Sequence, residues 1–294
     1  MNKWKGRSKG TILGYRIFVW CIKNIGIRSS YFVLYFVATY YFIFEKKSNQ
    51  YISYYFKNRL NFSALKTKLS VFRSYFVFGK VLIDKTAISV GLRNRFTYEF
   101  DGIENIKNLL AEKKGGVLIS AHIGNFEIAE HFFADIDFDA QINLVTTDQE
   151  VTAIREYMES ISVKKSNIKF IFVKDDMSHI FRINEALSNN ELICFTGDRY
   201  FEGSKFMEAD LLGKTAKFPA GPFLIASRLR VPVVYVYVMK EKNLHYHLYA
   251  RVAQNIKNRD SQGLLNSYVQ NLESMLKKYP LQWFNYFDFW DDID

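Results

Sequence analysis

The residues best suited to proton transfer in this 294-residue chain are His122 and Glu127. His122 follows the apolar run at residues 116–121, and Gly124 allows the sharp turn that would lead into a helix. Glu127 would then lie in the first turn of that helix, where its carboxylate can accept a hydrogen bond from one imidazole nitrogen. The other nitrogen would be left as an acceptor, so the pair predicts an oriented general base.

Two other uses of His122 are open from the sequence. It could be a structural residue at the end of a strand, or it could bind a metal together with Glu127. A metal site needs a third ligand, for which Asp198 is the best candidate. Glu130 is a second possible partner for the imidazole, but it lies further from the start of the helix. We favour the His122–Glu127 pair and assign no metal.

Charged residues also follow a second apolar run, at residues 192–196. Gly197 allows a turn there, and Asp198 and Arg199 come directly after it. A guanidinium can bind phosphate through two parallel hydrogen bonds, and Asp198 could orient it. A purely structural ion pair is the alternative. We predict that both residues bind substrate, and we assign the same role to Asn125 in the turn after His122.

A third candidate is the helix start at residues 217–222. Pro219 preorganises the first turn, and Gly221 allows a ligand to approach closely. Backbone amides at such a start favour a phosphate or a developing oxyanion. We therefore predict that Pro219 and Gly221 also bind substrate.

A sheet is needed to bring these residues together, and the sequence after residue 96 predicts one. Short runs rich in Val and Ile alternate with helical patterns, which is typical of an α/β fold with a mostly parallel sheet flanked by helices. Ligands of such sheets bind beyond the carboxyl ends of the strands. The last two runs could pair antiparallel. Strands are predicted at residues 116–121, 142–147, 168–173, 192–196, 231–239 and 244–252. Helices are predicted at residues 125–134, 150–161, 178–188, 219–229 and 261–279.

The amino-terminal third differs from the rest in charge. Residues 1–100 carry 18 lysines and arginines against three acids, whereas the net charge of the whole chain is +10. The stretch 29–44 is uncharged and slightly shorter than the ~20 residues of a straight membrane span. Its basic flanks and tyrosines suit a helix in or across the headgroup region, and a buried core helix is the alternative. We predict a membrane-contacting helical region at residues 1–95 and an α/β domain at residues 96–294.

Aromatic and basic residues between positions 46 and 92 could also clamp a nucleic acid. Their near-helical spacing favours amphipathic helices instead, so we expect membrane lipids and not nucleic acid as partners. The composition, 49% hydrophobic with two cysteines, excludes a disordered chain and a disulfide scaffold.

Taken together, these features resemble the lysophospholipid acyltransferase superfamily, and within it the branch of late lipid A acyltransferases of the lauroyl and myristoyl type. The His-x4-acid motif of that family is matched by His122 and Glu127. The resemblance covers about residues 115–239. Its further elements follow in family order, and they are Asp198 with Arg199, the glycine loop at Gly203, the stretch 212–216, the Pro-x-Gly helix start and the Val-Pro-Val-Val strand.

The resemblance implies an O-acyltransferase on the cytoplasmic face of a bacterial inner membrane, with no metal or redox cofactor. It would move a fatty acyl chain from an acyl carrier protein or coenzyme A thioester to a hydroxyl of a lipid A precursor or related lipid. His122 would deprotonate that hydroxyl, Glu127 would hold the imidazole, and Arg199 would bind a phosphate of acceptor or donor. The alternatives are another lipid or a pigment as acceptor, a hydrolase that uses the same His–Glu pair with or without a metal, and a non-catalytic protein that binds a membrane or a nucleic acid.

Overall fold

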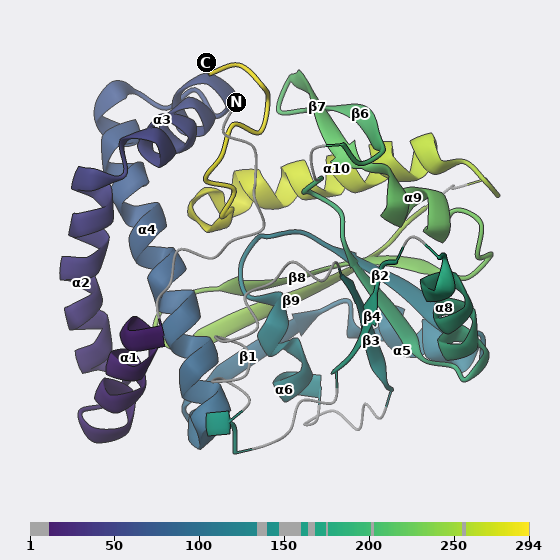
Figure 1. The fold of residues 1–294 in the computed structure, drawn as a ribbon, viewed down its shortest axis with the longest axis horizontal. Coiled ribbons are helices and arrows are strands. Elements are labelled where there is room, and N and C mark those ends of the chain that lie inside the picture. Colours follow the sequence, from purple (N-terminus) through teal and green to yellow (C-terminus); the bar gives the residue numbers. More distant parts are fainter. Residues whose placement is uncertain are drawn as a thin grey trace.

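The structure is a computed structural model that describes residues 12–133, 140–146, 160–163, 168–174, 176–200, 203–254 and 257–293. A seven-stranded sheet lies at its centre, with helices on both faces (Figure 1). Its strands are β1 (Thr97–Asp101), β2 (Gly116–Ser120), β3 (Ile142–Thr146), β4 (Ile168–Phe172), β5 (Leu192–Thr196), β8 (Val233–Lys240) and β9 (His245–Val252). They lie in the order β1-β9-β8-β2-β5-β3-β4.

Most neighbouring strands of this sheet are parallel. β2 pairs in parallel with β5 on one side and with β8 on the other, and β3 pairs in parallel with β5 and β4. β9 runs antiparallel to β8, and β1 joins β9 in parallel at the edge. The predicted mostly parallel mixed sheet flanked by helices is therefore confirmed, as is the antiparallel pairing of its last two strands.

Each face of the sheet has its own hydrophobic core, because successive side chains of a strand point to opposite faces. Val117 and Ile119 of β2 belong to a core that includes buried leucines of α10, whereas Leu118 belongs to a core that includes Leu109 of α5. β2 is buried along its whole length. The α-helices that the structure describes in this part of the chain are α5 (Ile103–Ala111), α6 (Ala129–Phe133), α8 (Ser178–Ser188), α9 (Ala220–Ala226) and α10 (Ser261–Lys278).

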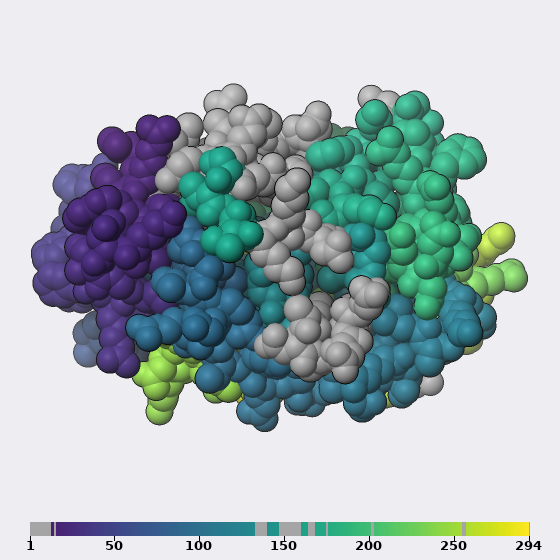
Figure 2. Space-filling model, turned by 90° about the horizontal axis from the view of Figure 1, so that it is seen from below, coloured from purple at the N-terminus to yellow at the C-terminus, as the bar shows by residue number. Residues whose placement is uncertain are grey.

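Among the described residues, four α-helices precede the sheet and form one end of the molecule, at the left of Figure 1 and around the purple atoms of Figure 2. α4 connects the others to the sheet, because its Val71 belongs to one core and its Ile83 to the other. α2 approaches α4 closely where Leu34 lies against Gly79, since a Cβ at position 79 would overlap the leucine side chain. These helices are α1 (Ile12–Asn24), α2 (Ile27–Phe44), α3 (Lys46–Tyr54) and α4 (Ala64–Ala87).

Among the described residues, α2 is the one helix long and apolar enough to cross a membrane, and 22% of that stretch is buried. Its outward side carries large aromatic side chains, of which Phe32 is 69% exposed and Phe36 is 63% exposed. An exposed apolar surface of this kind is typical of a face that contacts a membrane or a partner. The helix predicted around residues 29–44 is thus present with a largely uncovered apolar face.

Some elements differ from those predicted. β1, α5 and the antiparallel hairpin of β6 (Phe206–Leu211) and β7 (Lys214–Pro219) were not predicted. The helix expected at residues 125–134 begins as a 3-10 turn over Phe126–Ile128 and continues as α6. The helix expected at residues 150–161 lies almost wholly outside the described residues. The division into domains at residue 95 stays a prediction.

A buried ion pair joins the amino-terminal helices to the sheet. Asp84 of α4 is fully buried and accepts hydrogen bonds from Lys240 Nζ at 2.5 Å and Tyr246 Oη at 2.5 Å. The hydroxyl of Tyr31 in α2 donates to the same carboxylate. A carboxylate without water needs such partners, so this cluster fixes the positions of α2, α4 and the ends of β8 and β9 relative to one another.

Replacing Lys240 with methionine should therefore destabilise the protein strongly, because it leaves Asp84 buried without its counterion. Loss of one partner from a buried pair costs about 3–5 kcal/mol. The matched control is Lys277→Met, which removes a pair with Glu273 on the surface of α10 and should cost less than about 1 kcal/mol. Denaturant unfolding of the purified variants measures both values.

Addition of Asp84→Leu to Lys240→Met should restore much of the lost stability, since no charge then remains buried. A Lys240→Met variant no less stable than Lys277→Met would contradict the importance of this cluster.

Candidate active site

The turn after β2 is held in place by the end of β8 and by the segment at residues 282–284. Gly124 has a φ of 63°, and a Cβ there would overlap the carbonyl oxygen of Val238. Its amide donates to the Gln282 carbonyl oxygen at 2.9 Å, and the amide of Asn125 donates to the Val238 oxygen at 2.7 Å. Only glycine combines this backbone conformation with such close packing, so Gly124 fixes the path of the chain beside His122.

His122 and Asp198 are brought together by the pairing of β2 with β5. Each residue lies two positions beyond its strand, and the parallel register aligns Ser120 with Thr196. The imidazole Nδ1 of His122 lies 2.7 Å from Asp198 Oδ1. The backbone amide of His122 also donates to both oxygens of this carboxylate, at 3.0 Å and 3.1 Å.

Two side chains from the carboxyl-terminal segment complete the surroundings of Asp198. Trp283 Nε1 donates to Oδ2 at 3.2 Å, and Asn285 Nδ2 donates to the same oxygen at 3.0 Å. The carboxyl group is fully buried. Burial alone would raise the pKa of Asp198, but the charges of His122 and Arg199 and the hydrogen bonds from the His122 ring and Asn285 outweigh it and hold that pKa well below its usual range. Asp198 is therefore ionised at neutral pH.

An ionised Asp198 determines which imidazole nitrogen of His122 carries the proton. Nδ1 must donate to the carboxylate, so in the neutral imidazole Nε2 is the basic nitrogen. Burial and the charge of Arg199 lower the pKa of His122, although Asp198 and Glu127 act in the opposite direction. The ring is consequently neutral at pH 7, and 24% of the side chain is exposed. These are the properties of a general base that a substrate can reach.

Glu127 occupies a different position from the one predicted. The carboxylate bonded to the imidazole is that of Asp198, whereas the Glu127 carboxylate forms an ion pair with Lys85 of α4. Glu127 lies in a 3-10 turn and its side chain is 48% exposed. Its charge still favours the protonated imidazole, because it raises the pKa of His122. The two carboxylates thus act on His122 in different ways, one by direct hydrogen bonding and one through its charge.

The predicted substrate-binding residues are only partly brought together. Arg199 lies beside the pair, and its Nε donates to Asn285 Oδ1 at 2.6 Å while Nη2 donates to the Phe284 carbonyl oxygen at 2.9 Å. Asn125 is buried, and its side-chain amide donates to the Val81 carbonyl oxygen of α4 at 3.1 Å. It braces the turn against α4, and substrate contact by this side chain stays a prediction.

Pro219 and Gly221 lie where β7 leads into α9. Phe223 of α9 packs closely against Gly197, since a Cβ added there would lie 3.1 Å from its ring. The hydrogen bonds described for His122 and Asp198 include neither Pro219 nor Gly221. Their role at the substrate therefore stays a prediction.

Trp283 and Asn285 are not among the site residues predicted from the sequence. An asparagine inside the run Trp-Phe-Asn-Tyr-Phe is a usable signal, because a polar side chain in a buried aromatic segment needs a partner.

Within the described residues no group of three or more His, Cys, Asp and Glu side chains has the arrangement of a metal site.

The sequence profile of one protein family, bacterial lipid A biosynthesis acyltransferase, matches residues 74–290. The match covers more than half of the chain. It includes His122, Glu127, Asp198 and Asn285, and it begins within α4. No curated protein matches the chain.

The histidine should make the stability of the protein depend on pH. The pKa of His122 is lower in the folded protein than the ~6.5 of an unfolded chain. Between these values the unfolded chain binds more protons, so stability present above pH ~6.5 is lost as the pH falls. The denaturant midpoint of the wild type should decrease between pH 7 and pH 5.

A His122→Gln variant should lose less stability over this range, and the two proteins should behave alike between pH 7.5 and pH 8.5. The low pKa of Asp198 acts only at lower pH, where its protonation removes a further contribution. Equal slopes for the two proteins between pH 7 and pH 5 would contradict a lowered pKa for His122.

Proposed function

This chain belongs to the bacterial lipid A biosynthesis acyltransferase family, and from this premise we propose that it transfers a fatty acyl group from a thioester to a hydroxyl of a membrane lipid. The observation that carries the proposal is the imidazole of His122, oriented through Nδ1 by the buried Asp198 at 2.7 Å. We propose a lipid A precursor or a related lipid as the acceptor, and acyl carrier protein or coenzyme A as the carrier of the thioester.

In this mechanism Nε2 of His122 takes the proton of the acceptor hydroxyl while the oxygen attacks the thioester carbonyl carbon. The tetrahedral intermediate then expels the thiolate, which takes the proton back from the imidazolium. Asp198 holds the ring and stabilises the imidazolium, and the Glu127 charge favours the same protonated form. The step needs no cofactor beyond the thioester itself. Base catalysis of this type contributes about 10²–10⁴ in rate.

Arg199 provides positive charge beside the reacting group. Its guanidinium is held by the carboxyl-terminal segment through Asn285 and Phe284. We propose that it attracts a phosphate of the acceptor or of the donor, for which a guanidinium is well suited.

We further propose that α2 places the enzyme at the cytoplasmic face of the bacterial inner membrane. A lipid acceptor leaves the bilayer only at high cost, because its acyl chains would be exposed to water. The exposed aromatic side chains of α2 supply an apolar face, and α4 connects this helix to the active site through Lys85 and Val81. The site is thereby kept near the surface that the acceptor occupies.

Substitutions in the site should reduce acyl transfer in a graded way. A suitable assay combines the purified protein, an acyl carrier protein thioester and a lipid extract from cells that lack this protein, with mass spectrometry of the gain of one acyl group. His122→Ala should lower the rate by about 10²–10⁴, and Asp198→Asn should cause a comparable loss. Glu127→Gln should cause a smaller loss, because Glu127 favours the imidazolium through its charge whereas Asp198 is hydrogen-bonded to the ring.

The matched control is Glu185→Gln on the exposed side of α8, which should react at the wild-type rate. A coenzyme A thioester in parallel distinguishes the two carriers. Full turnover by both His122→Ala and Glu127→Gln, in proteins that unfold like the wild type, would rule out the proposed chemistry.

Substitutions that introduce negative charges on the exposed face of α2 should release the protein from membranes. Phe32→Glu with Phe36→Glu removes two apolar side chains, each worth about 1.5–3 kcal/mol when buried. Flotation with phosphatidylglycerol vesicles after detergent removal should show at least a tenfold loss of binding. Phe181→Glu is the control, because Phe181 is 77% exposed on α8 at another part of the surface. An equal effect of the control, or unchanged flotation of the double variant, would argue against contact through α2.

A further inference from the structure

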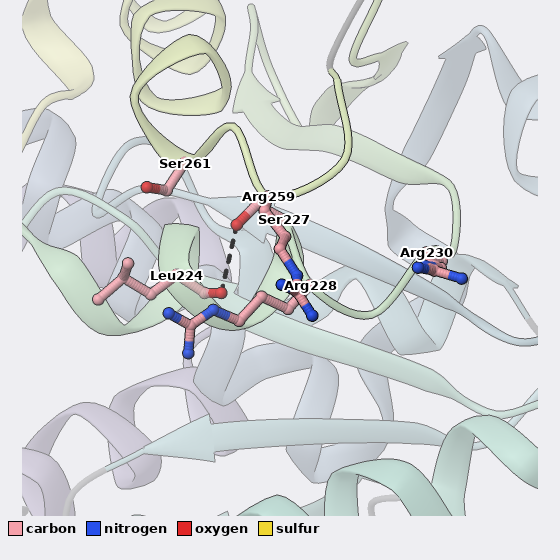
Figure 3. Close-up of a pocket in the computed structure, with 6 residues that line it drawn as sticks. All are labelled: Leu224, Ser227, Arg228, Arg230, Arg259 and Ser261. Carbon is pink, nitrogen blue, oxygen red and sulfur yellow. Dashed lines mark hydrogen bonds between the residues drawn. The ribbon is translucent and has the colours of Figure 1, made fainter.

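A cavity of about 550 Å³ lies between the end of α9 and the start of α10. Figure 3 shows its lining, which consists of Leu224, Ser227, Arg228, Arg230, Arg259 and Ser261. Arginine is the most frequent residue of this lining. The cavity is distinct from the site around His122, since none of the residues described there contributes to it.

The cavity lies near the amino-terminal ends of the central strands, whereas the catalytic histidine lies beyond their carboxyl ends. Arg230 comes just before β8, and the neighbouring Pro232 oxygen accepts a hydrogen bond from Val117 at the start of β2. His122 follows the other end of β2. At about 3.3 Å per residue, the strand alone separates the two sites by on the order of 15 Å. A group bound here therefore does not contact the reacting atoms.

The three arginines bring a charge of +3 to one concave surface. Within the part of the chain that the structure describes, no hydrogen bond or ion pair engages their guanidinium groups. The nearest acid along the chain, Asp260, is occupied as the cap of α10, where its carboxylate accepts from Gly263 N at 2.8 Å. The three guanidinium groups give the cavity a positive charge, which an anion bound there would offset.

The walls of the cavity are fixed relative to each other. Arg259 N donates to the Ser227 carbonyl oxygen at 2.9 Å, which ties the segment before α10 to the end of α9. Arg230 and Arg259 both have left-handed backbone conformations, with φ of 54° and 64°. Non-glycine residues adopt this conformation uncommonly, and here the two arginines lie in the short connections that lead into β8 and α10. The hydrogen bond between Arg259 and Ser227 therefore fixes the backbone on both sides of the cavity.

We propose that this cavity binds a small soluble molecule that carries a phosphate or diphosphate group. Guanidinium groups match the geometry of phosphate oxygens and can bind them through paired hydrogen bonds. The volume is within the ~300–1,000 Å³ of small-molecule sites. The amino terminus of the 18-residue α10 adds partial positive charge at the same place.

The position of the cavity favours a soluble ligand over a lipid headgroup. α9 and the start of α10 lie at the end of the molecule opposite α1 and α2 (Figure 1). With α2 against the bilayer, as proposed above, the cavity faces away from the membrane. The ligand would then come from the aqueous side.

Titration calorimetry of the full chain in detergent, with pyrophosphate as the probe, tests this inference. The wild type should bind pyrophosphate saturably, and Arg228→Gln with Arg230→Gln and Arg259→Gln should weaken the affinity at least tenfold. Arg228→Lys keeps the charge but loses the paired hydrogen bonds, so it should give a smaller loss. Arg182→Gln on α8 is the control for net charge and should bind like the wild type.

Should the triple variant fail to fold, Arg228→Gln and Arg259→Gln alone should each weaken binding about threefold or more. Affinities within twofold of the wild type in these variants, or an equal loss in Arg182→Gln, would overturn the proposal. Reduced flotation of the triple variant with phosphatidylglycerol vesicles would identify a lipid headgroup and would overturn the assignment to a soluble ligand. His122→Ala should bind pyrophosphate normally, so this result does not depend on the proposed acyl transfer.

Discussion

The architecture of the candidate site depends on one buried carboxylate. Asp198 has no contact with solvent, and its two oxygens accept hydrogen bonds from the backbone and ring of His122, from Trp283 and from Asn285. A buried negative charge is tolerated only when its partners are in place. The carboxylate thereby requires three separate segments of the chain to meet, and it selects the imidazole tautomer in which Nε2 can accept a proton.

The same requirement explains why the end of the chain belongs to the site. Asn285 donates to Asp198 with its amide nitrogen and accepts from Arg199 with its amide oxygen. It therefore connects the anionic and cationic residues that follow β5. Trp283 and Phe284 before it are buried, and Lys217 forms an ion pair with Asp291 beyond it. A segment with little regular secondary structure is held by polar contacts at both its ends.

Much of this arrangement could be predicted from the sequence, but the partner of the histidine could not. Short Val- and Ile-rich runs identified β2 to β5, β8 and β9, and the rule that ligands bind beyond carboxyl strand ends placed His122 and Asp198 at one edge. Proximity along the chain favoured Glu127, whereas the actual hydrogen bond depends on β2 lying beside β5, which local patterns do not reveal. β1 and the β6–β7 hairpin were missed because their alternating charged residues lack a continuous apolar run.

The buried contact between Asp84 and Lys240 has a mechanical consequence. Tyr31 of α2 and Tyr246 of β9 bond to the same carboxylate, so α2 is attached directly to the end of the sheet and not only through the chain that connects them. This attachment sets the distance between His122 and the surface that α2 contacts. For the acyl transfer proposed above, acceptors would then be selected by the distance of their hydroxyl group from that surface.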